Sequence, residues 1–122
     1  MEMVYIAGPY MGDNKNRLSV EQNVLDCKKQ LARMLDFGML PISPITMYDK
    51  FDLYTDYDEE FWYELTMELL KKCDSVWFYP GYERSRGAKN ELRYAVEHGM
   101  TIYFEGIVAN DNKDVLDILY GE

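Results

Sequence analysis

The sequence is poor in the residues that hold metal ions and disulfide frameworks, with one histidine and two cysteines in 122 residues. Small disulfide scaffolds are denser in cysteine, so Cys27 and Cys73 are expected to be reduced core residues, which suits a cytoplasmic protein. One histidine and two distant cysteines also disfavour a zinc site. We therefore expect no metal and no cofactor.

Basic charge and long apolar runs are also scarce. The chain has 13 lysines and arginines against 22 aspartates and glutamates, which gives a net charge of −9. Such an acidic surface repels nucleic-acid polymers and anionic membranes, although one local pocket can still take a small phosphorylated ligand. No apolar run nears the roughly 18 residues of a membrane span. Residues 1–6 lack the basic and long apolar regions of a signal peptide.

Apolar residues are plentiful, at 48% of the chain, with 15% aromatic residues, and they favour one folded domain over residues 1–122. Short apolar runs, typical of buried strands, alternate with segments in which apolar residues recur at helical spacing. The expected strands cover residues 3–7, 39–43, 74–79 and 101–104, and the expected helices cover residues 19–37, 58–73, 85–98 and 111–120. Residues 45–57 show no clear period and are expected to form a loop or lid.

This alternation predicts an α/β fold with right-handed crossovers and helices on both faces of the sheet. We expect a single-domain, Rossmann- or flavodoxin-like three-layer sandwich around a parallel sheet of about four or five strands. Ligands bind such sheets at the carboxyl ends of the strands. Residues 8–14, 41–57 and 80–87 are therefore expected to gather at one end of the sheet.

The segment from Ser85 to Glu91 follows an expected strand and opens an expected helix. Ser85 as N-cap satisfies one N–H group of the first turn, and Gly87 lets a ligand approach the backbone there. The positive helix end suits a phosphate. Glu91 lies about 9 Å deeper along the helix, roughly the span from the phosphate of a nucleotide to its sugar C1′. Alternatively, this is a well-capped surface helix with Glu91 on its solvent face.

Two other segments carry candidate functions. Tyr5 lies inside an expected buried strand, so its hydroxyl needs a partner, and Gly8 at the strand end permits close backbone approach. The alternative for Tyr5 is a core tyrosine bonded to a main-chain group. The aromatic residues of the acidic segment between 45 and 63 either cover a base by stacking on it, or the segment is an ordinary irregular loop between two elements.

Read together, four segments resemble one known family. They are Tyr5-Ile6-Ala7-Gly8-Pro9, residues 38–44, residues 73–76 and the spaced pattern Ser85-x-Gly87-x-x-x-Glu91-x-x-x-Ala95-x-x-x-Gly99. In order and spacing they are similar to the nucleoside 2-deoxyribosyltransferase superfamily, which includes the deoxynucleoside 5′-monophosphate N-glycosidases. A small uncharacterised branch with YIAGP and SxGAxxE motifs looks closest. The resemblance runs from residue 3 to about residue 104.

The resemblance implies roles for particular residues. In the family, a glutamate at the position of Glu91 attacks the sugar C1′ and forms a covalent deoxyribosyl ester, and a tyrosine at the position of Tyr5 orients that carboxylate. An anion beneath the anomeric carbon stabilises the oxocarbenium-like state of N-glycoside cleavage. In phosphate-dependent members, the serine and glycine that match Ser85 and Gly87 hold the 5′-phosphate. Gly8 and Arg86 complete the predicted substrate-binding set.

The sequence departs from the family pattern at two places. Many active members carry an aspartate that contacts the sugar or the leaving base where this chain has Thr66. The monophosphate hydrolases have a serine and an arginine where Pro9 and Met11 stand, and Pro9 offers no N–H donor. Arg17, Arg84 and Arg86 are the residues available to compensate.

Three functions therefore stay open. The leading one is an enzyme that cleaves or transfers the N-glycosidic bond of a (deoxy)nucleoside or its 5′-monophosphate. The second is a nucleotide-binding or sensing module of the same fold, which Thr66 favours, and the third is a structural protein with a vestigial pocket. The family commonly completes its pocket with a neighbouring subunit, and exposed aromatic residues are expected at Trp62, Tyr63, Tyr79 and Tyr82, so a homodimer or larger assembly is also predicted.

Overall fold

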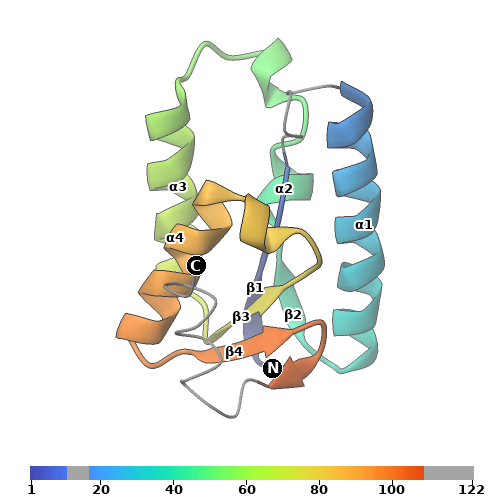
Figure 1. Ribbon diagram of the computed structural model, residues 1–122, viewed down its shortest axis with the longest axis vertical. Helices are drawn as coiled ribbons and strands as arrows, with labels where there is room; N and C mark the ends of the chain where they lie inside the picture. The colour runs from blue at the N-terminus through green and yellow to red at the C-terminus, as the bar shows by residue number, and fades with distance from the viewer. Residues whose placement is uncertain (11–16, 109–122) are drawn as a thin grey trace.

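The computed structural model describes residues 1–10 and 17–108 of the chain. Its elements are β1 (Met3–Ala7), α1 (Arg17–Asp36), β2 (Leu40–Ile42), α2 (Pro44–Met47), η1 (Phe51–Leu53), α3 (Glu59–Lys71), β3 (Ser75–Phe78), η2 (Tyr82–Arg84), α4 (Arg86–Glu97), β4 (Thr101–Phe104) and β5 (Ile107–Val108) (Figure 1). The expected strands and the helices α1, α3 and α4 are confirmed to within a few residues. The helix expected over residues 111–120 lies outside the described residues.

The sheet has five strands in the order β2-β1-β3-β4-β5. The pairs β1–β2, β1–β3 and β3–β4 are parallel, as expected, but β5 runs antiparallel to β4. The expected parallel sheet is therefore confirmed for β2, β1, β3 and β4, and β5 is an antiparallel addition at the edge. Glu105 and Gly106 both have positive φ, 50° and 90°, which makes a two-residue hairpin turn and returns the chain beside β4.

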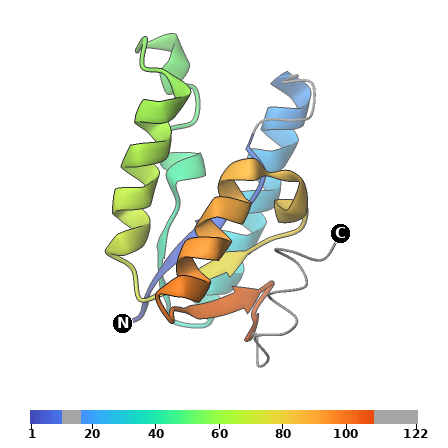
Figure 2. The same ribbon diagram turned by 60° about the vertical axis from the view of Figure 1, so that its left-hand side comes forward.

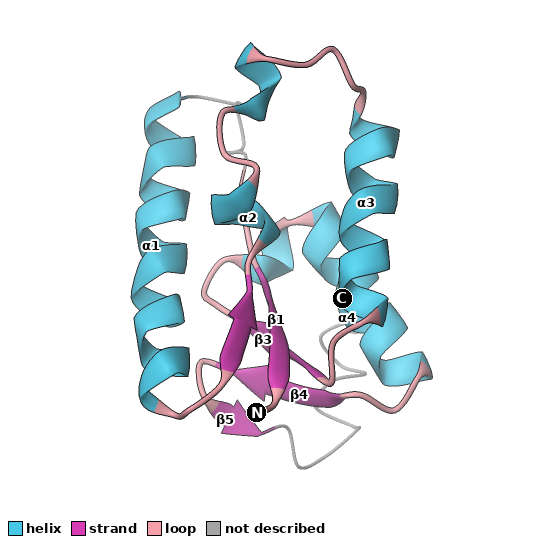
Figure 3. Cartoon of the chain, turned by 180° about the vertical axis from the view of Figure 1, so that it is seen from behind, coloured by secondary structure: helices cyan, strands magenta, loops and turns pink. Residues whose placement is uncertain are grey.

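Helices cover both faces of the sheet (Figures 2 and 3). Side chains alternate along each strand, so each strand contributes residues to the core on both faces. Val4 and Ile6 of β1 belong to one core cluster with Cys27 and Met34 of α1. Tyr5 and Ala7 point the other way, into a cluster with residues of α3 and α4 such as Leu70, Leu92 and Ala95. The middle strands are thus buried on both faces, and the three-layer α/β fold is confirmed.

Two local expectations are wrong. The segment 45–57 is not a continuous loop, because it begins within α2 and contains η1. Ser43 caps α2 by accepting a hydrogen bond from the Thr46 N–H at 3.3 Å, and Pro44 occupies the first turn. These helices are too short to show an apolar period. Tyr79, expected to be exposed, is fully buried.

Tyr79 fastens the end of β1 to the end of β3. Its hydroxyl donates to the main-chain oxygen of Pro9 at 2.7 Å, and its ring lies directly over Gly8. A Cβ atom built on Gly8 would stand 2.1 Å from Cε1 of the Tyr79 ring. Residue 8 must therefore be glycine for this ring to pack, a reason that the sequence did not indicate.

The chain crosses from one side of β1 to the other between β2 and β3, because β2 pairs with one edge of β1 and β3 pairs with the opposite edge. In open parallel sheets, such a change of direction leaves a crevice at the carboxyl ends of the two diverging strands. The segments after Ala7 and Phe78 therefore border a natural place for a ligand. Within the described residues, no helix is long and apolar enough to cross a membrane.

The packing of Tyr79 on Gly8 predicts that Gly8→Ala destabilises the fold by about 1–3 kcal/mol, the usual effect of overfilling a packed core. Gly87→Ala is the matched control, because a Cβ atom there meets nothing in the described chain closer than Ser85 Oγ at 4.0 Å. Urea unfolding of the two variants measures the difference. Equal stabilities would contradict the packing argument.

Candidate functional site

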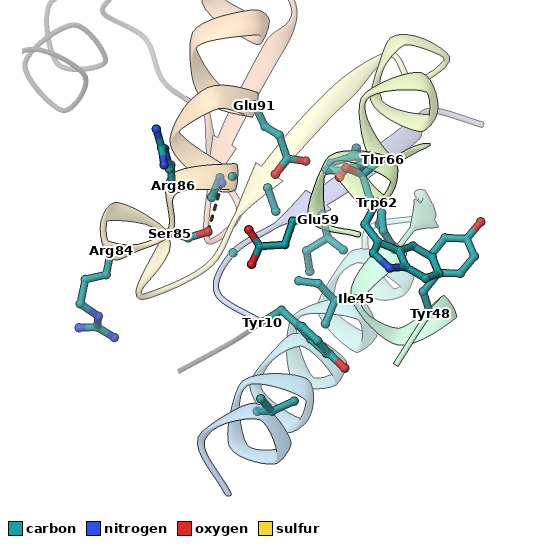
Figure 4. Close-up of a pocket in the computed structure, with 18 of the residues that line it drawn as sticks. Tyr10, Ile45, Tyr48, Glu59, Trp62, Thr66, Arg84, Ser85, Arg86 and Glu91 are labelled. Carbon is teal, nitrogen blue, oxygen red and sulfur yellow. Dashed lines mark hydrogen bonds between the residues drawn. The ribbon is translucent and has the colours of Figure 1, made fainter. Parts of the chain in front are cut away.

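A cavity of about 750 Å³ opens at the carboxyl end of β1, between this strand and residues of the helices α2, α3 and α4 (Figure 4). Its lining includes all six of the predicted site residues, namely Tyr5, Gly8, Ser85, Arg86, Gly87 and Glu91. Residues from all three segments expected to gather at this end also line it. The structure thus brings the predicted residues together in one place.

Glu91 lies deep in this cavity, on the buried face of α4. Only 8% of its surface is exposed, and its Oε2 atom is buried without a hydrogen-bond partner among the described residues. Burial raises the pKa of the Glu91 carboxyl to about 8, although hydrogen bonding with Tyr5 opposes the shift. A Glu91 on the solvent face is therefore the wrong alternative.

Tyr5 reaches the same point from β1. Its hydroxyl has the side chains of Glu91 and Thr66 as hydrogen-bonding neighbours, so the alternative of a main-chain partner alone does not describe it. Burial raises the pKa of Tyr5 well above its usual value, and the nearby charge of Glu91 raises it further. Tyr5 therefore stays neutral and keeps its O–H as a donor for the carboxylate.

Thr66 comes from α3, the helix that precedes β3. Its hydroxyl donates to the main-chain oxygen of Tyr63 at 3.0 Å and also neighbours the hydroxyl of Tyr5. Because Thr66 is neutral, this position adds no second negative charge beside Glu91. The sequence places a threonine here, and the structure shows that it borders the cavity.

The N-terminus of α4 forms another wall of the cavity. Ser85 is the N-cap, as predicted, and its Oγ accepts a hydrogen bond from the Ala88 N–H at 3.2 Å. An accepting hydroxyl can still donate its own hydrogen. Gly87 follows in the first turn, where the lack of a side chain leaves backbone open to the cavity. This combination suits an anion.

Arg84 and Arg86 also border the cavity, but both residues are exposed. Figure 4 shows their side chains extending away from Glu59 and Glu91. The predicted role of Arg86 in substrate binding would thus require its side chain to turn toward the cavity. The side chain of Arg84 would have to turn in the same way to contact a ligand. Gly8 lines the cavity as expected, while its missing side chain is already explained by Tyr79.

Aromatic and acidic side chains form the remaining wall. Tyr48 and Trp62 lie with ring centroids 5.5 Å apart, tilted by 48°, and both line the cavity. Asp52 and Glu59 line it as well. The sequence showed these residues only as an aromatic and acidic stretch, because the side of α3 that faces the cavity depends on how the helix packs. No group of three or more potential metal ligands occurs in the described part of the chain.

Comparison with known proteins supports the fold. The family model described as "Domain of unknown function (DUF7768)" matches residues 2–105, and no curated protein matches the chain. A structure of the 2-deoxyribosyltransferase from Bacillus psychrosaccharolyticus is similar, with a TM-score of 0.55 and 15% identity over 84% of this chain and 70% of that one. A conserved protein from Enterococcus faecalis V583 has a TM-score of 0.61 and 18% identity, over 85% of this chain and 62% of that one.

At these identities the likeness concerns the fold alone. The chain shares its architecture with a 2-deoxyribosyltransferase, which agrees with the superfamily that the sequence motifs resemble. The chain spans less than two thirds of the Enterococcus protein. Three points stay predictions: the match to the family's motifs, the branch of the superfamily, and the roles of the six predicted residues.

The raised pKa of Glu91 predicts how stability depends on pH. Between the usual pKa of 4.5 and about 8, the folded protein keeps a proton on Glu91 that the unfolded chain has lost. Stability therefore falls as pH rises through this window, by an amount on the order of 5 kcal/mol. Glu91→Gln removes this fall, because glutamine does not ionise.

Chemical unfolding from pH 4 to 9 measures this difference. Glu97→Gln, an exposed position on the same helix, is the control and should keep the wild-type profile. If wild type and Glu91→Gln change in parallel across the window, the carboxyl is not desolvated as the structure indicates.

Proposed function

The chain belongs to the DUF7768 family, and we propose that it cleaves or transfers the N-glycosidic bond of a (deoxy)nucleoside or nucleoside 5′-monophosphate, with Glu91 as the nucleophile. The observation that carries this proposal is the buried carboxyl of Glu91 at the cavity floor, with Oε2 unpartnered in the described structure and Tyr5 as its neighbour. A buried polar atom without a partner is costly in a fold that has no use for it. A substrate atom is the natural partner.

The proposed reaction uses the carboxylate form of Glu91. A carboxylate oxygen bonds to the sugar C1′ while the C1′–N bond breaks, and the leaving base keeps the electron pair and takes a proton from solvent water. Water or a second base then attacks C1′, the C1′–O bond to Glu91 breaks, the attacking group loses a proton to solvent, and Glu91 is returned as a carboxylate. Tyr5 keeps the carboxyl group oriented through its hydroxyl and holds its pKa lower than burial alone would set it. The two steps replace one difficult displacement.

The walls of the cavity fit the rest of such a substrate. The capped N-terminus of α4, with Ser85 and Gly87, suits a 5′-phosphate. Tyr48 and Trp62 offer aromatic surface for a base on the α2 and α3 side. Glu91 lies deeper along α4 than Ser85, which leaves the sugar between them.

The second candidate is a binding module that holds a nucleotide without turnover. Thr66 favours it, because the family resemblance puts an aspartate at this position in many active members. A homodimer also remains part of the proposal. Of the aromatic residues named for an interface, Tyr63 is 42% exposed, whereas Trp62 and Tyr82 are half-buried and Tyr79 is not available.

The function is tested by base release. Deoxynucleosides, ribonucleosides and their 5′-monophosphates are incubated with the protein, and free base is separated by chromatography. Wild type should release base from at least one compound, and Glu91→Gln should lower the rate at least about a hundredfold with folding retained. Equal rates would rule out Glu91 as the nucleophile. Binding without release from either protein would favour the binding module.

The raised pKa of Glu91 also predicts the pH dependence of base release. Since the carboxylate is the reactive form, kcat/KM should rise about tenfold per pH unit on the acid side and level near pH 8. Tyr5→Phe removes the hydrogen bond that lowers this pKa, so the acid limb should move to higher pH. A Tyr5→Phe profile displaced to lower pH, or unchanged, would contradict the positioning role.

A further inference from the structure

Helix α3 presents three polar or aromatic side chains to the cavity, Glu59, Trp62 and Thr66. Their spacing of three and four residues puts them on one face of the helix. Thr66 lies beside Tyr5, at the level of the reacting carboxyl. Glu59 lies two turns nearer the N-terminus, about 10 Å along the helix axis. Figure 4 shows its carboxylate directed into the cavity, between Ser85 and Trp62 in that view.

We propose that Glu59 is a specificity-determining residue that accepts hydrogen bonds from N–H groups on the outer edge of the bound base. The inference rests on the proposed function in one respect: the ligand is a nucleoside or nucleotide whose sugar lies against Glu91. A sugar and a base placed end to end from Glu91 outward bring the far edge of the base toward the first turn of α3. Trp62, between Thr66 and Glu59 on the same face, provides aromatic surface at the level of the base.

The chemistry of a carboxylate decides which bases fit. It has two acceptor oxygens and no donor when ionised, so it favours an edge that presents N–H groups and disfavours one that presents carbonyl oxygen or ring nitrogen. Guanine presents N1–H and N2–H side by side, which matches both oxygens of one carboxylate. Asp52, which also lines the cavity, adds a second acidic side chain to this wall.

The distribution of charge in the cavity supports the same orientation. The acidic residues Asp52 and Glu59 come from η1 and α3, whereas the N-terminus of α4, with Ser85 and Gly87, forms another wall of the cavity. A nucleotide carries its negative charge on the phosphate and its N–H donors on the base. It therefore binds with the phosphate toward α4 and the base edge toward Glu59.

The test compares two 2′-deoxynucleoside 5′-monophosphates, with guanine and with hypoxanthine, which differ by the 2-amino group alone. Wild type should prefer the guanine compound at least tenfold in kcat/KM, because the 2-amino group adds a second charge-assisted hydrogen bond to the carboxylate. In Glu59→Gln the preference should fall at least fivefold, since an amide has one acceptor oxygen only. Glu60→Gln should keep the wild-type preference.

Glu60 is the matched control because it lies in the same first turn and is exposed, yet it does not line the cavity. Both substitutions remove one acidic residue from the N-terminus of α3, so a general effect on the helix affects them alike. A preference that is the same in wild type and Glu59→Gln would overturn the inference, as would a wild type that prefers hypoxanthine.

Equilibrium binding of the same two compounds, measured by calorimetry, separates this inference from the proposed function. If neither compound loses its base but the guanine compound binds at least tenfold tighter, and Glu59→Gln alone reduces that ratio, Glu59 selects the base in a protein that does not catalyse. If base is released without any effect of Glu59→Gln on the ratio, the proposed function stands and the role of Glu59 is wrong. Absence of both binding and release for these two compounds overturns the role of Glu59, while the proposed function is decided by the full panel of nucleosides and nucleotides.

Discussion

The carboxyl of Glu91 is held inside an apolar part of the fold, and the rest of the site is arranged around that burial. Its neighbours on α4, Ala88, Leu92 and Ala95, pack in the same core cluster as Tyr5. Burial leaves the carboxylate poorly solvated there, so its pKa rises to about 8, and hydrogen bonding with Tyr5 opposes the rise. A carboxyl in this state costs stability at neutral pH, and a ligand that engages it recovers part of that cost.

The fold holds this carboxyl at a fixed place relative to the cavity. β1 and β3 are paired in register from Val4 to Ala7, and Tyr79 fastens the residues that follow both strands through Pro9. Ser85 starts α4 at the cavity wall and so determines the depth at which Glu91 lies along that helix. Each of these contacts is ordinary in itself. Together they put a buried acid, a neutral phenol and an open helix end around one cavity.

Much of this arrangement could be predicted from the sequence, because the signals involved are local. Short apolar runs and helical spacing located the main strands and helices, and Ser85 carries a recognisable N-cap position. The burial of Glu91 had a signal as well, since it lies three residues after Ala88 and four before Ala95, on the apolar face of α4. Both the solvent-facing and the buried interpretation are compatible with the bare spacing, so only the packing of α4 distinguishes them.

Other features have no local signal in the sequence. The strand β5 has two residues and depends on positive φ at Glu105, which glutamate rarely adopts. The direction of Glu59 into the cavity depends on how α3 packs, which no local pattern records.

Glu91 is proposed to form a covalent bond to the sugar, and mass spectrometry of the protein quenched in acid during turnover can detect that bond. An added deoxyribosyl group, with its phosphate where the substrate carries one, is expected on the peptide that contains Glu91, and no such addition in Glu91→Gln. Base release that continues without any adduct, or an adduct on another residue, would contradict it.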